Sequence, residues 1–314
     1  AQSLSSGERV AVLLGNFAQQ HPQATQLSLI AQQIAMLSNA SFGYLGEAAN
    51  SVGGYVANAV PSATGMNAAQ MLAQPRKAYL LLNVEAELDT HDAQQAIAAM
   101  QAADMVVALS AYKQQASSYA DVMLPIAPFT ETSGTFINTA GRAQSFKGAV
   151  KPLGEARPAW KVLRVLGNLL DVAGFDYDSS EAVRDEVLAN YNSASLNNAI
   201  TGVAMQAVNV VSNNGVQRVS HVPIYGTDAV VRRAVSLQKT NDAATPVVVM
   251  HSSELAKLGV LSGHSVKVTQ GKGSVTLQIQ SDDDQPVNTA RIAAGHAATA
   301  ALGAMFGTLT VERA

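Results

Sequence analysis

The chain has 314 residues, a net charge of −3 at pH 7 and no cysteine. Without Cys, disulfide bonds and thiolate-bound iron–sulfur clusters are excluded within these residues, and because no run of Lys and Arg is longer than the pair Arg232 and Arg233, a nucleic-acid partner is not expected. No apolar run approaches the roughly 18 to 20 residues that cross a bilayer, so direct membrane insertion is not expected either.

The first part of the chain pairs a strand pattern with a helical one. Residues 9–14 form an apolar run of strand length, and residues 23–37 repeat apolar side chains every three or four positions, which is typical of an amphipathic helix. The predicted inward face of this helix consists of Leu27, Ile30, Ala31, Ile34 and Leu37. Residues 15–16 and 50–53 follow strand-like runs, so a pterin or nucleotide phosphate could lie against their backbone amides. Neither a dinucleotide-binding nor a P-loop fingerprint is present.

A second strand, helix and strand series follows. Residues 77–82 and 104–109 are strand runs of the buried type, and the segment between them predicts a helix with Asp89 as its N-cap and Asp92 in its first turn. The order of strands and helices favours a parallel sheet covered by helices on both faces.

The segment 117–146 carries the most specific pattern. Residues 119–125 read as a short apolar strand that ends at a proline, which has no backbone N–H to extend a sheet. Glu131 opens a predicted loop in which Gly134 and Gly141 are expected to take backbone angles that other residues avoid. The pattern ADVxLP followed by ExxGTxxNxxGRxQ resembles the molybdopterin-dependent oxidoreductase superfamily. The extension SFKGAVKPLGEARPAWKVLRVLGNLL narrows the resemblance to the large iron–sulfur subunit, the G subunit, of bacterial NADH:quinone oxidoreductase, complex I.

This resemblance implies that the chain is the C-terminal part of such a subunit, and its start at Ala1 without Met fits a fragment or processed product. The parent complex carries electrons from NADH to quinone in the respiratory chain, and the iron–sulfur clusters are expected in the upstream part of the parent subunit. No cofactor is expected within these residues, which would act as a redox-silent scaffold. The expected partners are the other hydrophilic complex I subunits and the upstream region of the same chain, on the cytoplasmic face of the inner membrane.

The second half changes from helical to alternating patterns. Helices are predicted from Pro158 onward and near Asp178, and residues 191–214 are rich in Asn, Ser, Ala and Gly, as in a linker. Residues 264–270 and 273–280 alternate apolar and polar side chains around a Gly-Lys-Gly turn, which predicts a half-buried hairpin. The predicted fold class is therefore α/β. A parallel-sheet, molybdopterin-oxidoreductase-like domain is expected over residues 1–190, and a small β-barrel over residues 215–314, which the resemblance implies to be double-psi.

Eight residues are candidates for a vestigial pterin site, and all of them come from the resemblance. They are Glu131, Gly134, Thr135, Asn138, Gly141, Arg142, Arg233 and Gln238. The structural alternative is that the charged members cap backbone groups or pair with one another, and that Arg232 and Arg233 are solvated or pair with acids at a subunit boundary. No catalytic residue is predicted, and the six histidines show no spacing that would predict a metal site.

Two other functions remain open. The chain could be the last part of an active molybdenum or tungsten oxidoreductase, such as a formate dehydrogenase, whose metal ligand would lie upstream. It could also be a stand-alone nucleotide-binding module that uses the α/β part.

Overall fold

The structure is a computed structural model that describes residues 2–62, 64–113, 116–206 and 215–314. By contact the chain divides into two units, each built from three stretches of sequence. Unit 1 holds the described residues of Ala1–Ala63, Phe129–Lys151 and Trp160–Val211, and unit 2 holds those of Thr64–Pro128, Pro152–Ala159 and Ser212–Ala314. The domain boundaries expected at residues 190 and 215 stay a prediction, and residues 207–214 of the expected linker lie outside the described residues.

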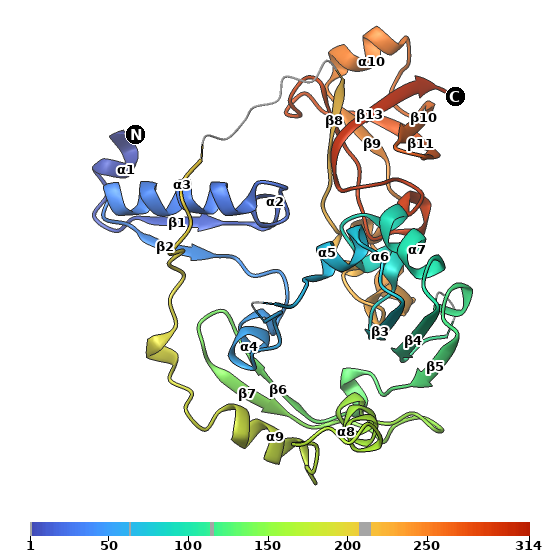
Figure 1. The fold of residues 1–314 in the computed structure, drawn as a ribbon. Helices are drawn as coiled ribbons and strands as arrows, with labels where there is room; N and C mark the ends of the chain where they lie inside the picture. The colour runs from blue at the N-terminus through green and yellow to red at the C-terminus, as the bar shows by residue number, and fades with distance from the viewer. Residues whose placement is uncertain (1, 63, 114–115, 207–214) are drawn as a thin grey trace. The chain divides into compact units, whose positions relative to one another are not determined.

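Unit 1 contains a two-stranded parallel sheet with a long helix beside it (Figure 1). Strand β1 (Ala11–Leu14) pairs with β2 (Ser41–Tyr44), and α3 (Ala24–Leu37) connects them. The inward face predicted for α3 is partly wrong, because Ile34 is 40% and Leu37 80% exposed. The buried side chains of α3 are Ser28, Leu29, Ala31 and Ala35. Three of these four are short, and short side chains allow a helix to approach its neighbours closely.

The segment expected to be a loop after Glu131 is a β-hairpin. Strand β6 (Gly134–Ile137) runs antiparallel to β7 (Ala143–Phe146). The turn between them is closed by Asn138, whose Oδ1 accepts the N–H groups of Ala140 at 3.1 Å and of Arg142 at 2.9 Å. An Asn side chain that bonds to backbone two or more residues ahead stabilises a turn, so the residues that suggested a loop build the hairpin's end.

The remaining helices of unit 1 are short. They are α1 (Gln2–Ser5), α2 (Asn16–Gln19), α4 (Ser51–Val56), α8 (Ala159–Leu169, all but its first residue), α9 (Ser180–Val187) and the 3-10 turns Phe129–Glu131 and Ser193–Ser195. The predicted start of α9 near Asp178 is one residue early, since the Ser179 hydroxyl accepts the N–H of Ala182 at 3.1 Å and is the N-cap.

Unit 2 begins with a three-stranded parallel sheet of order β3-β4-β5. Its strands are β3 (Ala78–Leu82), β4 (Met105–Ser110) and β5 (Val122–Pro125), and its helices are α5 (Ala68–Ala73), α6 (Ala86–Asp89) and α7 (Ala93–Gln101). The helix predicted here starts later than expected. Asp89 is the last residue of α6, and Asp92 is the N-cap of α7, with its Oδ1 3.0 Å from the N–H of Gln95.

Helix α7 covers one face of the β3-β4-β5 sheet. On that face Tyr79 and Val106 pack against Ala96, Ala99 and Met100 of α7. The other face is only partly covered: Leu109 is fully buried there, next to Leu82 in the register, but Leu80 is 49%, Leu82 44%, Met105 48% and Val122 41% exposed. The single sheet with two covered faces that the sequence predicted is therefore two separate parallel sheets, of two and three strands.

The second part of unit 2 is a closed six-stranded barrel of order β10-β11-β9-β12-β8-β13. Its strands are β8 (Val216–Val219), β9 (Val248–Met250), β10 (Ser265–Gln270), β11 (Gly273–Ser281), β12 (Thr289–Arg291) and β13 (Phe306–Arg313). The predicted hairpin is confirmed: β10 and β11 pair with Gln270 opposite Gly273, and Leu277 and Ile279 face the core. The helix α10 (Ser252–Leu258) ends at Gly259, whose φ of 65° is left-handed.

Helix α7 is joined to the barrel by side-chain hydrogen bonds. The Gln94 amide donates to the carbonyls of Gln270 at 3.0 Å and Ala301 at 2.9 Å, and its Oε1 accepts the N–H of Lys272 at 3.3 Å. Nearby, Arg218 is 2% exposed, and burial lowers its pKa to about 10. These contacts make the β3-β4-β5 sheet and the barrel parts of one packed unit. Among the described helices, none has the length and apolar character that spanning a bilayer requires.

Candidate functional site

The candidates in the hairpin mainly shape the backbone. Gly141 has the expected positive φ of 77°, and its carbonyl accepts a hydrogen bond from the Tyr191 hydroxyl. Gly134 does not need a positive φ; it lies in β6 beneath Phe146, where an added Cβ would come within 2.7 Å of the ring. The hydroxyls of Thr135 and Ser145 share a hydrogen bond of 2.9 Å across the two strands.

The other members of the motif, Glu131, Asn138 and Arg142, do not come together at one site. Glu131 ends a 3-10 turn, and Asn138 closes the hairpin. The side chain of Arg142 is exposed, while its backbone carbonyl accepts the N–H of Asn138 at 3.2 Å. The structure therefore brings Gly134 and Thr135 to a cavity, whereas Glu131, Asn138, Gly141 and Arg142 do not line it.

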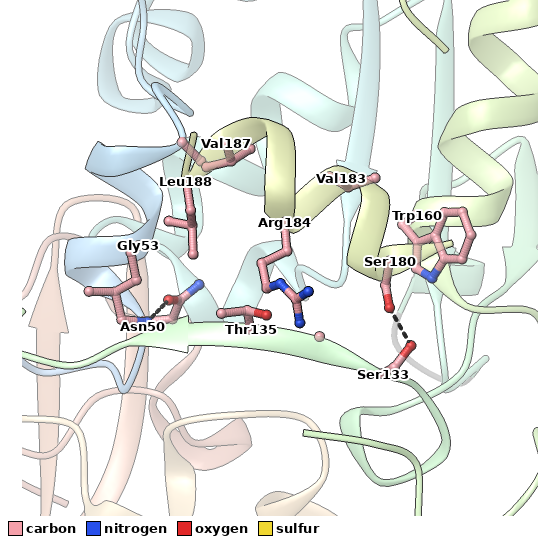
Figure 2. A pocket seen from close by; sticks show the side chains of 13 residues that line it. Asn50, Gly53, Ser133, Thr135, Trp160, Ser180, Val183, Arg184, Val187 and Leu188 are labelled. Atoms are coloured by element: carbon pink, nitrogen blue, oxygen red, sulfur yellow. Dashed lines mark hydrogen bonds between the residues drawn. The ribbon is translucent and has the colours of Figure 1, made fainter. Parts of the chain in front are cut away.

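This cavity lies within unit 1 and has a volume of about 240 Å³. Figure 2 shows Arg184 of α9 reaching toward β6, with Trp160 and a Ser133–Ser180 pair at one end and Asn50 and Gly53 at the other. The two serine hydroxyls are 2.6 Å apart. Val183, Val187 and Leu188 give the cavity a largely apolar wall.

The polar groups around this cavity are mostly engaged with the protein itself. Arg184 contacts Asp185 through Nε at 2.7 Å and Nη2 at 2.6 Å. Asn50 accepts the N–H of Ile137 at 2.8 Å and so holds the end of β6. The segment 50–53, considered from sequence as a phosphate-binding turn, thus has a structural task. The buried Nε1 of Trp160 has no hydrogen-bond partner among the described residues.

A second cavity, of about 280 Å³, lies within unit 2 and contains the two remaining candidates. Its lining residues are Leu88, Pro223, Tyr225, Gly226, Arg232, Arg233, Gln238, Ala243, Ala244, Gly295, His296 and Ala297. Arg232 and Arg233 end a 3-10 turn, so consecutive residues present both guanidinium groups to the same region.

Two acids from the segment after β3 neutralise this arginine pair. Glu85 bonds to Nη1 of Arg232 at 2.5 Å and also pairs with Nη2 of Arg233, while Asp89 pairs with Nη2 of Arg232. The Arg233 guanidinium also lies 4.3 Å from the centre of the Tyr112 ring. Although burial by itself lowers the pKa of Arg232, the contacts with Asp89 and Glu85 raise it above its ordinary value.

Gln238 and His296, the other polar residues considered in this cavity, differ in how many of their hydrogen-bonding atoms are engaged with the backbone. Gln238 donates both amide hydrogens to backbone carbonyls, of Tyr225 at 2.9 Å and of Val231 at 2.8 Å. His296 accepts the N–H of Ala298 on Nδ1 at 3.0 Å, which leaves its proton on Nε2. Burial lowers the pKa of His296, so this ring is neutral at pH 7.

Sequence reasoning missed Glu85 as a member of this site. Glu85 and Asp89 lie in the acidic run Glu-Ala-Glu-Leu-Asp, which is separated by two residues from the end of the predicted strand 77–82, and that run was a usable signal. Asp89 was instead interpreted as a helix cap. In the described parts of the chain, no three His, Cys, Asp or Glu side chains lie together in a way that could hold a metal ion.

Comparison with known proteins places this architecture in a family. Residues 1–169 match the family model described as molybdopterin oxidoreductase. That stretch is more than half of the chain, and the chain therefore belongs to the molybdopterin oxidoreductase family.

Individual relatives match over shorter stretches. The chain is 46% identical over 68 residues to the mitochondrial NADH-ubiquinone oxidoreductase 78 kDa subunit of Candida albicans, covering 22% of this chain and 9% of that protein. It is 38% identical over 92 residues to a putative formate dehydrogenase of Staphylococcus aureus, covering 29% of this chain and 9% of that protein. The match thus spans about a tenth of each relative's length.

Among solved structures, acetylene hydratase from Pelobacter acetylenicus is similar with a TM-score of 0.56 and 15% identity. The similarity covers 81% of this chain and 48% of that one. At this level of identity it shows the fold alone. That fold is a mixed α/β arrangement with parallel sheets and a barrel.

The family name implies a pterin cofactor, which carries an anionic phosphate. The cavity of unit 2 lined by Arg232 and Arg233, called the arginine cavity below, does not fit this phosphate. Each guanidinium there is already paired with a carboxylate, and both amide hydrogens of Gln238 are bound to backbone. Glu85 and Asp89 do not line the cavity, but they lie in direct contact with the guanidinium groups that do, so an entering phosphate would find positive charge that is already compensated.

Proposed function

We propose that these residues form a redox-silent, structural C-terminal region of a hydrophilic subunit of NADH:quinone oxidoreductase, complex I. In this role they support electron transfer from NADH to quinone, carried by iron–sulfur clusters in the upstream part of the parent subunit. The observation that carries the proposal is the pairing of Arg232 and Arg233 with Glu85 and Asp89. The match to the Candida albicans 78 kDa subunit supports the choice of complex.

The proposed partners are the other hydrophilic complex I subunits and the upstream region of the same chain. Exposed apolar side chains support this part of the proposal. One face of the β3-β4-β5 sheet exposes Leu80 and Met105, although parallel sheets are normally covered on both faces. In unit 1, Leu169 and Leu170 at the end of α8 are 77% and 66% exposed.

Two finer assignments belong to the same proposal. The region lies at the cytoplasmic face of the inner membrane as a peripheral part of the complex. The barrel is of the double-psi type, and its two parallel pairs, β8 with β12 and β9 with β11, support that topology.

Metal and pterin analysis of the full-length parent polypeptide, purified from its own cells, tests the proposal. We expect iron from the upstream clusters and neither molybdenum nor tungsten in stoichiometric amount. An affinity tag on the same polypeptide is expected to co-purify other hydrophilic complex I subunits. A stoichiometric molybdenum- or tungsten-bearing pterin would contradict the redox-silent role.

The second candidate is the C-terminal part of an active molybdopterin-dependent oxidoreductase such as a formate dehydrogenase. The 92-residue match to a putative formate dehydrogenase of Staphylococcus aureus favours it. The same metal analysis separates the two functions, because the active enzyme needs about one molybdenum or tungsten per polypeptide for its chemistry.

A further inference from the structure

Glu85 lies in unit 2 beside the arginine cavity, in a segment that is held by hydrogen bonds from its backbone. It is the N-cap of α6, and its backbone N–H donates to Oδ2 of Asp89 at 2.7 Å. The next residue, Ala86, donates its N–H to the Tyr119 hydroxyl at 3.1 Å. The Glu85 side chain is only 4% exposed. Such a buried and anchored carboxylate loses little further conformational freedom when it binds a cation.

The N–H groups of Arg232 and Arg233 donate to the carboxylates of Glu85 and Asp89 and to two backbone carbonyls. Arg232 directs Nη1 to Glu85 at 2.5 Å, Nη2 to Asp89 and Nε to the carbonyl of Gly226 at 2.9 Å. Arg233 directs Nη2 to Glu85, and its Nη1 donates to the carbonyl of Ala229 at 3.0 Å. Two positive and two negative charges sum to zero. The cluster therefore offers an anion in solution no net charge to attract it.

We infer that Glu85 and Asp89 are built-in substitutes for a bound anion, so that this cavity excludes phosphate-bearing ligands and admits neutral molecules. Guanidinium groups bind a carboxylate and a phosphate with the same planar, two-point geometry, so one can take the place of the other. The neutral His296 ring, which also lines the cavity, offers its Nε2–H, and this donor suits an uncharged ligand with an acceptor oxygen.

Removing one acid is expected to convert the cavity into an anion site. Breaking a buried ion pair leaves an uncompensated charge, and an anion from solution can then supply the missing partner. Asp89→Asn is the suitable change, because the Asp89 side chain is more exposed than that of Glu85, 22% against 4%. The amide oxygen of the variant can still accept the N–H of Glu85.

Titration of the full chain with inorganic pyrophosphate at constant ionic strength, followed by calorimetry and thermal melting, tests the inference. We expect no saturable binding to the wild-type chain. The Asp89→Asn variant is expected to bind pyrophosphate at least about tenfold more tightly than the weakest binding that the wild-type titration could detect. It is also expected to melt at a higher temperature when pyrophosphate is present. Asp282→Asn is the matched control, because it frees Arg291 from an ion pair in which both side chains are more than a third exposed. We expect no gain in that variant.

Two results would overturn the inference. The first is a folded Asp89→Asn chain that binds pyrophosphate no more tightly than wild type. If that variant fails to fold, Glu85→Gln takes its place. Saturable binding to the wild-type chain that Arg233→Gln abolishes would overturn the inference even if neither acid variant folds. The inference rests on one part of the proposed function, which is that no pterin occupies this cavity. Metal analysis of the parent polypeptide judges that function separately.

Discussion

Gly134 illustrates how one residue of the motif is constrained by a side chain on the facing strand. It lies opposite Phe146 in the β6–β7 pair, and an added Cβ would be 2.7 Å from the tip of that ring and 3.1 Å from the next ring carbon. Sequence reasoning attributed this glycine to an unusual backbone angle. In the structure the glycine is needed because the Phe146 ring lies directly over it, and this neighbour is known only once the two strands are paired.

We therefore expect Gly134→Ala to lower the free energy of unfolding by about 1 to 3 kcal/mol, as overpacking does elsewhere. Thermal or urea unfolding measures the change. Gly54→Ala in α4 is the control, because an added Cβ there meets nothing within 4 Å and Ala favours a helix. Equal stability of Gly134→Ala and wild type would show that Phe146 can move aside.

His296 makes a prediction about pH. Burial lowers its folded-state pKa, so the unfolded chain binds the proton more readily, and stability falls as pH drops below the unfolded value of about 6.5. His296→Asn keeps an acceptor for the N–H of Ala298 but removes the titration. We expect a smaller loss of melting temperature between about pH 7.5 and 5.5 in the variant. The loss should not vanish, because burial also lowers the pKa of His91 and His221. A slope identical to that of wild type would contradict the assignment.

At the scale of elements, α7 is tied to the barrel through one side chain. Gln94 makes three hydrogen bonds to the barrel backbone, at Gln270, Ala301 and Lys272. Nothing in the helical pattern around Gln94 distinguishes it from its neighbour Gln95, which is exposed. The difference arises because only Gln94 points toward the turn between β10 and β11.

Gln94→Ala is therefore expected to loosen that turn without unfolding the chain. The Lys272 amide loses its acceptor, and we expect its hydrogen exchange to become about five- to tenfold faster, as for the loss of roughly 1 kcal/mol. Gln95→Ala is the control, and its Lys272 exchange should match that of wild type. Unchanged exchange in Gln94→Ala would contradict the role of this junction.

Several elements were predictable from local pattern and several were not. The β10–β11 hairpin follows from alternation and a Gly-Lys-Gly turn, because neighbours in sequence carry these signals. The inward face of α3 did not follow, since two apolar residues of its repeat, Ile34 and Leu37, are exposed. Which side of a helix is buried depends on its packing partner as well as on its own periodicity.

At the scale of the whole molecule, the two units expose apolar surface that a partner is expected to cover. In unit 2 this surface is the partly covered face of the β3-β4-β5 sheet, with Leu80, Leu82, Met105 and Val122. We expect Leu80→Lys to leave the melting temperature of the isolated chain nearly unchanged, because its side chain is already half exposed. In the parent protein the same change should reduce co-purification of other hydrophilic subunits.

Leu261→Lys is the control for that experiment. Leu261 is 70% exposed, follows α10 in the barrel part of unit 2 and is not part of the sheet, so the same substitution there should leave co-purification intact. Assembly of Leu80→Lys as complete as that of wild type would show that this face of the sheet is not an interface with those subunits.

The sequence by itself determined the family, the strands and helices with the strongest local patterns, the barrel hairpin and the absence of any thiolate ligand within these residues, because all of these are properties of residues close together in the chain. Tertiary structure alone decided that the motif after Glu131 is a hairpin packed around Phe146, and that the arginine pair is neutralised from within. Glu85 and Arg233 are 148 positions apart. No local pattern predicts their pairing, because burial in the folded unit is what requires each charge to find a partner.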